Sequence, residues 1–428
     1  MSISFGIWRL AATALTAVAA STAWGAEALT LLEAQRLAVA QSQQLAAQDA
    51  NIEATQQQAL AAGQLPDPVL KLGVDSLPVN GSDRFNMTRD FMTMRRIGLS
   101  QEIPRAEKRQ LRTEGFERET MRIRAQRQLT LANVQRDSAL AWLDRHYAQA
   151  QRELLQQQLE ETRLQVQAAD SAFRTSRGNQ ADVFAARAAV SMLQDRLSQI
   201  DRQSRNAGLM LARWVGSANA ERPTSGSLPW QTTPLEGALS AERLKLHPDL
   251  MVIGAEVDAA QTQARLAQAN KKSDISVEAS YAQRGPAYSN MLSFGISIPL
   301  QWDQANRQNR ELSAKLAMVD EAKARYEDTL RSREAQVQSW LSDWQTGKER
   351  LTRYRDELIP LARQRTEATL TAYRTGKSDL AAGLLARRDE IDVRIQALVL
   401  EMETARSWAQ LNFLVPNSPP FSPIKDRP

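Results

Sequence analysis

Two segments of the chain alternate between apolar and polar residues with the period of two that is typical of β-strands. In residues 274–300, apolar residues occupy every second position, with serine, glycine or glutamate mostly between them. Residues 68–103 show the same alternation in two arms, 68–77 and 95–103. Pro104 and Pro299 end the second arms, where a missing ladder donor is tolerated. Two β-hairpins are therefore predicted, at about 68–103 and 275–299, each apolar on one face and small or polar on the other.

The sequence around these hairpins is rich in alanine, glutamine, glutamate, arginine and leucine, which favour helices. No proline occurs between Pro104 and Pro223, so residues 105–172 are predicted to form one helix, roughly 100 Å long at about 1.5 Å per residue. In the second half, Pro360 is predicted to kink the corresponding helix. The predicted helices cover 30–63, 105–172 and 180–214, and then 236–271, 303–374 and 379–414.

The two halves of the chain repeat each other. "AFRTSRGNQADVFAAR" (172–187) and "AYRTGKSDLAAGLLAR" (372–387) align without a gap at an offset of 200 residues. Earlier pieces match in the same order at similar offsets, including "SQEIP" (100–104) with "GISIP" (295–299). This pattern indicates a duplication with insertions in loops. It predicts a repeat at 27–215, a linker at 216–235, a second repeat at 236–415 and a proline-rich tail at 416–428.

The N-terminal segment has the composition of a secretory signal peptide. Arg9 precedes an apolar stretch at 10–23, and small residues follow it, which predicts a signal peptide over 1–26 cleaved between Gly25 and Ala28. The alternative is a short N-terminal helix or anchor. Export is therefore predicted, without disulfides or lipidation because the sequence contains no cysteine. No later segment contains the roughly 18 to 20 apolar residues that a membrane-spanning helix needs.

The four predicted strands are about as long as a tilted strand that crosses a bilayer, about 9 to 11 residues. Their alternation suits barrel strands with a wet lumen, although a soluble sheet with one buried face shows the same pattern. An open sheet in lipid would leave backbone groups unpaired, so only closed barrels persist there. If these strands enter a membrane, several chains must therefore contribute to one barrel.

The whole sequence after the signal peptide resembles the TolC-type outer-membrane factor family. The resemblance rests on the duplicated plan, "HPDL" at 247–250, the "IP" strand ends, and the "RTS" and "RTG" turns. Within the family, residues 65–112 are most similar to the branch that serves heavy-metal efflux of the cobalt–zinc–cadmium or copper–silver type.

This resemblance implies a mainly α-helical fold with a small β part, built from two helix–β-hairpin–long-helix–helix repeats. It implies a homotrimer with a 12-stranded barrel in outer-membrane lipid and a helical barrel in the periplasm. It also implies docking to a periplasmic adaptor and to a proton-driven inner-membrane pump of the RND type. Two alternatives stay open: an outer channel for drug efflux or type I protein secretion, and, more distantly, a periplasmic coiled-coil scaffold.

The resemblance places the periplasmic tips, where adaptors dock and the gate closes, at 173–183 and 373–383. Asp182 stands where the family commonly has an aspartate, but Ala382 is its counterpart in the second half, which puts an acidic ring from that half in doubt. Arg174 and Arg374 are hypothesised to act in docking or gating, with ordinary solvated helix surface as the alternative. The candidate tip residues are Phe173, Arg174, Thr175, Arg177, Asp182, Tyr373, Arg374, Thr375, Gly376, Lys377 and Asp379.

No catalytic constellation is recognisable in the sequence, and neither an enzyme nor a cofactor is expected. The only histidines, His146 and His247, lie far apart in sequence, and His247 is predicted to open a helix with Pro248 in its first turn rather than to bind a metal. Three methionines in the first hairpin suit a Cu(I) contact or simple loop packing: Met87, Met92 and Met94. The net charge of +5 is spread along the chain, which argues against a nucleic-acid partner.

Overall fold

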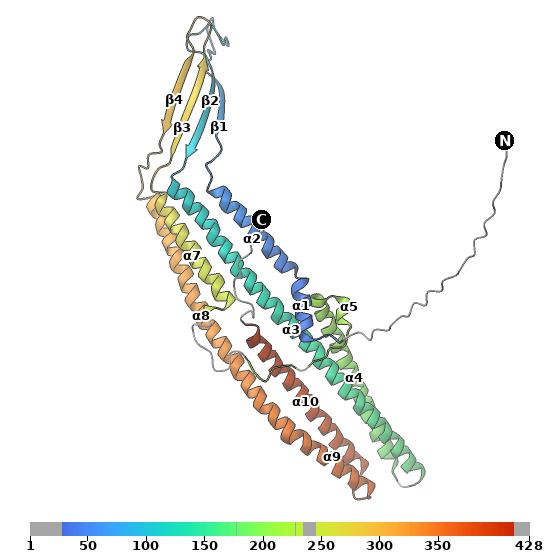
Figure 1. Ribbon diagram of the computed structural model, residues 1–428. Coiled ribbons are helices and arrows are strands. Elements are labelled where there is room, and N and C mark those ends of the chain that lie inside the picture. The colour runs from blue at the N-terminus through green and yellow to red at the C-terminus, as the bar shows by residue number, and fades with distance from the viewer. Residues whose placement is uncertain (1–27, 177, 227, 234–244, 415–428) are drawn as a thin grey trace, which may run out of the picture.

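The protein is elongated, with a β-sheet at one end and long helices that run to turns at the other (Figure 1). The computed structural model describes residues 28–176, 178–226, 228–233 and 245–414. The predicted signal peptide, the start of the second repeat and the proline-rich tail from residue 416 lie outside these residues, as does Arg177.

Both halves present the same order of elements. The first contains α1 (Leu31–Ala40), α2 (Gln43–Ala62), β1 (Val69–Asp75), β2 (Met94–Ile103), α3 (Ala106–Arg174), α4 (Gln180–Val215) and the short α5 (Ser217–Ala220). The second contains α7 (Pro248–Ala269), β3 (Ile275–Gln283), β4 (Met291–Ser297), α8 (Gln308–Arg353), the π-helical turn η1 (Tyr354–Leu358), α9 (Ile359–Arg374) and α10 (Leu380–Asn412). The predicted fold class, mainly helical with a small sheet and a repeated plan, is confirmed.

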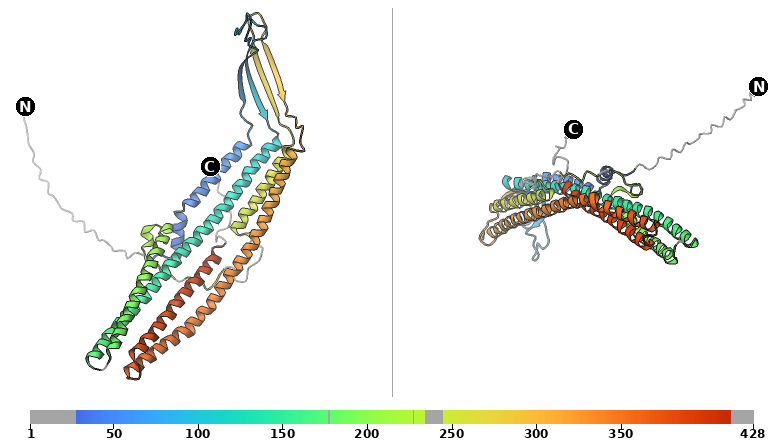
Figure 2. Two further views of the ribbon diagram at one scale, coloured as in Figure 1. Left: turned by 180° about the vertical axis from the view of Figure 1, so that it is seen from behind. Right: turned by 90° about the horizontal axis from the view of Figure 1, so that it is seen from below.

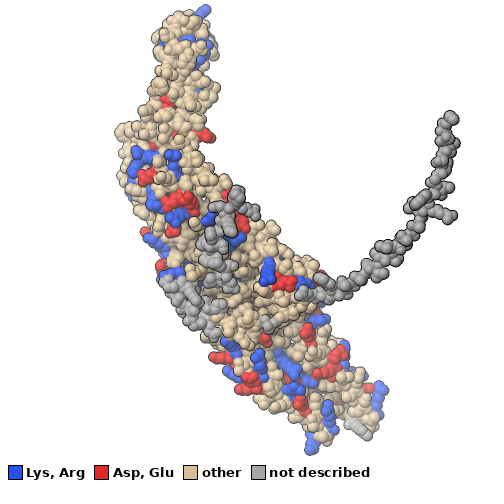
Figure 3. Space-filling view, viewed as in Figure 1, with Lys and Arg blue, Asp and Glu red and all other residues tan. Residues whose placement is uncertain are grey.

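The four strands form one antiparallel sheet in the order β1-β2-β3-β4. The register aligns apolar residues with apolar ones across the strands, as in Leu70 opposite Leu99 and Leu99 opposite Ala279. The apolar face stays open to solvent in the single chain: Leu72 is 71% exposed and Phe294 is 78% exposed. In the part of the chain that the structure describes, the outer edges of β1 and β4 have no partner strand. Figure 3 shows the sheet end as mostly uncharged, whereas the helices carry many acidic and basic side chains.

The helices form a curved layer. Seen from below, they spread along an arc rather than around a single axis (Figure 2). Helix α3 is the central element, because α2, α4 and α7 all pack along it, while α8 packs against α7 and α10. Across the described residues, no helix is both long and apolar enough to cross a membrane.

The hydrophobic core lies midway along the helices, where three tryptophans fix irregular segments. The indole of Trp142 donates to the Leu29 carbonyl at 2.9 Å, and that of Trp344 donates to the Trp230 carbonyl at 2.7 Å. Trp408 likewise donates to the Thr232 carbonyl at 3.0 Å. The described part of the predicted linker is therefore packed against the helices by buried bonds, rather than being a loose connection.

Three predicted helices differ from the structure. The helix predicted at 30–63 is broken into α1 and α2, because Ser42 accepts a hydrogen bond from the Leu45 backbone at 3.3 Å and starts a new helix. The one predicted at 236–271 is observed as α7, which starts at Pro248; residues 236–244 lie outside the described residues. The one predicted from 303 starts at Gln308, because Asp303 caps a turn through Asn306.

The predicted kink at Pro360 takes the form of the turn η1. Proline lacks the backbone N–H that would continue the α-helical ladder. Just before it, the Ile359 N–H bonds to the Tyr354 carbonyl, the wider spacing of a π-turn. The matching region of the first half lies within the continuous α3, so the two halves differ here.

Candidate functional site

The turns at the far ends of the two helical hairpins have the same backbone geometry. Thr175 and Thr375 follow the last helical residues, and their hydroxyls donate to the carbonyls of Ser171 at 3.0 Å and Thr371 at 3.1 Å. The next residue in each turn has a positive φ, 54° at Ser176 and 72° at Gly376. Glycine adopts this conformation freely, whereas serine does so at some cost. The duplicated turn is thus preserved in three dimensions at the offset of 200 found in the sequence.

The returning helices begin with side-chain caps at matching positions. Asn179 accepts from the Ala181 backbone N–H, and Asp379 accepts from the Ala382 N–H at 2.9 Å. A negative charge is favourable at a helix N-terminus, which explains why Asp379 stands at the N-cap of α10. Asp379, one of the predicted tip residues, therefore acts as the N-cap of its own helix in the structure.

The basic residues of the tips point into solvent. Arg174 is 76% exposed at its side chain and pairs at 2.7 Å with Asp170 of its own helix, not with Asp182. Arg374 and Lys377 are exposed at the second turn, and Phe173 is 43% exposed at the first. An exposed pair such as Arg174 with Asp170 contributes only about 0 to 1 kcal/mol, which leaves the arginine available for a partner.

The two tips of one chain contact each other. Val183 from the first hairpin and Leu380 from the second are both buried in one small apolar cluster, and Tyr373 packs against it. Burial raises the pKa of the Tyr373 hydroxyl, and the negative charge of Asp182 raises it further. Of the predicted site residues, Asp182 and Tyr373 are thus brought close together across the two hairpins.

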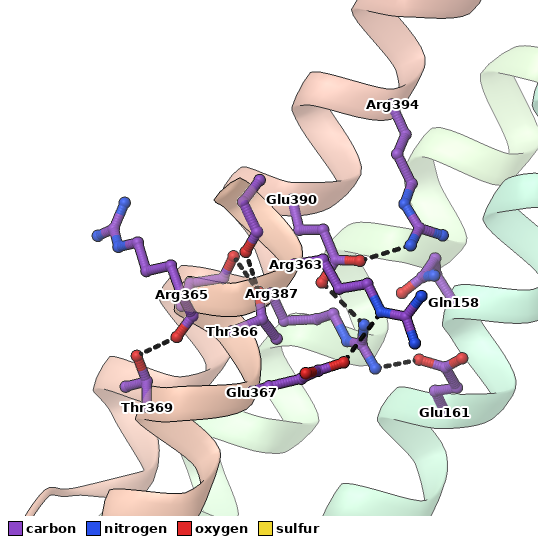
Figure 4. A network of polar contacts seen from close by, with 12 residues as sticks. Gln158, Glu161, Arg363, Arg365, Thr366, Glu367, Thr369, Arg387, Glu390 and Arg394 are labelled. Carbon is purple, nitrogen blue, oxygen red and sulfur yellow. Dashed lines mark hydrogen bonds and ion pairs between the residues drawn. The ribbon is translucent and has the colours of Figure 1, made fainter. Parts of the chain in front are cut away.

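A network of charged residues joins the hairpins farther from the tips (Figure 4). Arg387 of α10 pairs with Glu161 of α3, and also with Glu390 at 2.9 Å. The side chain of Glu390 is only 1% exposed and also pairs with Arg394 at 2.7 Å. Arg196 of α4 makes a further link by pairing with Asp392 of α10 at 2.5 Å. No sequence pattern predicts this network, because Glu161 and Arg387 are 226 residues apart.

A groove of about 770 Å³ runs between α4 and α10 beside this network. Small residues of α4, Ala185, Ala188 and Ala189, line one side and keep it open. Leu385 and Arg388 of α10 line the other. The run of alanines on one face of α4 is the sequence signal that could have indicated this groove.

The histidines have structural roles. The His247 ring nitrogen Nδ1 accepts from the Asp249 backbone N–H at 3.2 Å and Pro248 follows it, which confirms the predicted helix start. Burial, together with the charges of Arg333 and Arg136, lowers the pKa of His247 to about 4. His146 stacks on Trp142, with ring centroids 4.8 Å apart. Within the described ranges, no group of three or more His, Cys, Asp or Glu side chains is arranged to hold a metal ion.

Comparisons with known proteins agree with this architecture. Residues 239–415 match the family model described as "Outer membrane efflux protein". A comparison with curated protein sequences yields no match.

Solved structures match nearly the whole chain. CusC, from a study of its folding and transmembrane channel formation, matches with a TM-score of 0.75 and 16% identity over 90% of this chain and 92% of its own. The outer membrane protein VceC from Vibrio cholerae matches with a TM-score of 0.69 and 17% identity over 89% of this chain and 96% of its own. The open MtrE outer membrane channel of Neisseria gonorrhoeae matches with a TM-score of 0.69 and 16% identity, covering 90% of this chain and 88% of that one. Residues 239–415 thus match the outer membrane efflux protein model, and the described chain has the fold of these solved outer-membrane channel structures.

Proposed function

We propose that the protein is the outer-membrane exit channel of a tripartite efflux system. The observation that carries this proposal is the sheet, which among the described residues has no partner strand at either edge and has an open apolar face at the end of a long helical stem. A sheet of this kind is stable in lipid only if its edges are paired, and its apolar face then meets the acyl chains. Other copies of the chain supply strands of the same length and register.

The assembly proposed is a homotrimer. Four strands from each of three chains give a barrel of twelve, a closed barrel wide enough for a wet lumen. The helices of one chain form an arc (Figure 2), and the arcs of three chains are proposed to enclose a periplasmic tunnel together. Export of the chain is proposed to use its N-terminal signal segment.

The tips are proposed to dock a periplasmic adaptor, which connects the channel to an RND-type pump in the inner membrane. Support comes from the matched geometry of the two turns and from the exposed side chains of Phe173, Arg174, Arg374 and Lys377. Asp182, whose charge acts on the Tyr373 hydroxyl of the other hairpin, is proposed to act in the gate together with Tyr373.

The proposed cargo is heavy-metal cations. This assignment is supported by the similarity of residues 65–112 to the metal-efflux branch of the TolC-type family. Drug efflux and type I protein secretion use channels of the same plan and form the second candidate.

Growth of a deletion strain separates these cargoes. The deletion strain and its complemented counterpart are grown across graded Zn, Co, Cd, Ni, Cu and Ag, with dyes and antibiotics in parallel. Sensitivity confined to particular metals, reversed by complementation, supports metal export and names the cargo. Sensitivity to drugs alone overturns the metal assignment and keeps the channel. Unchanged growth under every condition contradicts a role in efflux.

A further inference from the structure

On the polar face of the sheet, three long charged side chains each lie opposite a glycine on the neighbouring strand. Lys71 on β1 lies opposite Gly98, and Arg96 on β2 lies opposite Gly73. Glu278 on β3 lies opposite Gly295. Because glycine has no side chain, a long neighbour can lie flat across the adjacent strand instead of standing away from the sheet.

Lys71 and Glu278 use this space to meet across an intervening strand. They belong to β1 and β3, with β2 between them, yet Lys71 Nζ lies 2.5 Å from Glu278 Oε2. A Cβ atom on Gly98 would lie 2.9 Å from the Ser280 Cβ, so this part of the polar face has no room for a side chain at Gly98. A second pair on the same face joins Arg96 Nε to Asp75 Oδ2 at 3.1 Å.

Both ion pairs are too exposed to contribute much to the free energy of folding. The Lys71 and Glu278 side chains are 47% and 30% exposed, and water screens such a pair so that it adds little to the free energy of folding. Their electrostatic effect is different in a pore, because low-dielectric walls focus the field of any uncompensated charge. Rings of charged side chains are how pores select ions by sign.

We propose that the pairs Lys71–Glu278 and Asp75–Arg96 form a charge-compensated belt on the lumen wall, so that this level of the pore passes solutes of either charge. The proposal rests on the proposed channel function, in which the polar face lines the lumen. It makes Lys71 and Glu278 residues that determine selectivity, since losing either one leaves three uncompensated charges of one sign in the trimer.

Reversal potentials in planar bilayers under a KCl gradient test the belt. Lys71→Gln leaves Glu278 uncompensated and shifts the reversal potential toward greater cation selectivity. Glu278→Gln leaves Lys71 and shifts it in the opposite direction, while the double variant returns to the wild-type value. Ser293→Gln is the matched control, because it adds an uncharged side chain to the row of Lys71 and Gly98. This control leaves the reversal potential at the wild-type value.

The outcomes separate this inference from the channel function. If the wild type forms pores and both single variants keep its reversal potential, the belt is wrong and the channel stands. If the purified wild type opens no pore, the channel function and the belt fail together.

Amine acylation distinguishes a true pair from two independent charges. In the pair, the N–H groups of Lys71 are directed at the Glu278 carboxylate. Removing that carboxylate therefore leaves the amine more accessible to the acylating reagent. Relative to Lys377, which is exposed at the far end of the molecule, Lys71 acylation rises in Glu278→Gln by up to roughly fivefold, the upper limit for an exposed ion pair. An unchanged ratio in the mass spectra overturns the pairing.

Discussion

Single buried residues hold the middle of the molecule together, and the sequence reveals only part of what they do. The "HPD" sequence predicts that His247 begins a helix, and the structure confirms it. Its burial and the arginines around it come from segments distant in the chain, such as Arg136 and Arg333, and no local pattern indicates them. The same holds for Trp142, whose partner is the carbonyl of Leu29, 113 residues away.

Stability is expected to depend on pH through His247. Its pKa is about 4 in the folded protein and about 6.5 when unfolded, so the unfolded chain takes up the proton first as pH falls. The stability that depends on a neutral His247 is fully present above about pH 6.5. As the pH falls toward 4, the free energy of unfolding decreases by up to roughly 3 kcal/mol. The thermal midpoint, followed by circular dichroism in detergent, therefore falls across this range.

His247→Asn is the control for that prediction. Asparagine is a favoured N-cap residue and supplies an oxygen for the Asp249 N–H, but it does not titrate. The variant should show a shallower loss of thermal midpoint between pH 6.5 and 4.5. An identical pH profile in the two proteins would mean that other groups carry the effect.

For helices and strands, the periodicity of the sequence predicts which face is apolar, but not where a helix is interrupted. The alternation in both hairpins predicts the two faces of the sheet, because a period of two leaves no freedom in which residues share a side. The break between α1 and α2 at Ser42 was missed, since the alanine-rich sequence continues through it. The π-turn η1 was predicted only as a kink. A proline in the sequence shows that one backbone N–H donor is missing, but not which hydrogen bonds the neighbouring residues form instead.

The contact between α8 and α10 at Gly347 should not tolerate a side chain. A Cβ atom on Gly347 would lie 2.2 Å from Thr404 Oγ1, and Thr404 is itself buried. Gly347→Ala is expected to lower the free energy of unfolding by about 1 to 3 kcal/mol through overpacking. Gly254→Ala is the matched control, because its nearest neighbour would be Tyr326 at 3.9 Å, and it should stabilise α7 by up to about 1 kcal/mol. Equal denaturation midpoints for the two variants would show that α8 and α10 can separate freely.

Adjacent residues on the two faces of β4 should respond oppositely to the same substitution. Phe294 lies on the apolar face and Ser293 on the polar face, in register with Ala279 and Ser280. Phe294→Lys places a charge against lipid at a cost of about 2 to 4 kcal/mol per chain, whereas Ser293→Lys faces the lumen. The amount of protein in the outer-membrane fraction should fall for the first variant and stay near wild type for the second. Equal amounts of both would contradict the assignment of the two faces.

At the scale of the whole molecule, the duplication predicts the repeated plan but not how the two hairpins meet. The offset of 200 residues correctly implies that the turns at 175 and 375 are alike. Two ion pairs join the hairpins and connect different repeats: Arg387 with Glu161, and Arg196 with Asp392. No pattern within either repeat indicates these partners. Among the predicted tip residues, Arg177 lies outside the described residues, and the roles of the others in docking and gating stay predictions.

Docking at the tips predicts a specific loss of efflux. Replacing both Arg174 and Arg374 with alanine removes two exposed cations, and the ion pair that the described residues show for Arg174 lies within its own helix, with Asp170. Resistance to the exported compounds should fall while the abundance of the trimer stays at the wild-type level. Arg363→Ala, an exposed residue that pairs with Glu367 in α9, is the matched control and should leave resistance unchanged. If the double variant supports wild-type resistance, these arginines do not act in docking or gating.

The central claim is that several copies of this chain close one pore, and the most direct measurement is the current carried by the purified protein in a planar lipid bilayer. The mass of the inserted species is determined first in detergent. The protein is expected to be a particle of three chains that inserts with discrete, stable steps of conductance. A particle of one chain, or a trimer that never conducts in lipid, would contradict it.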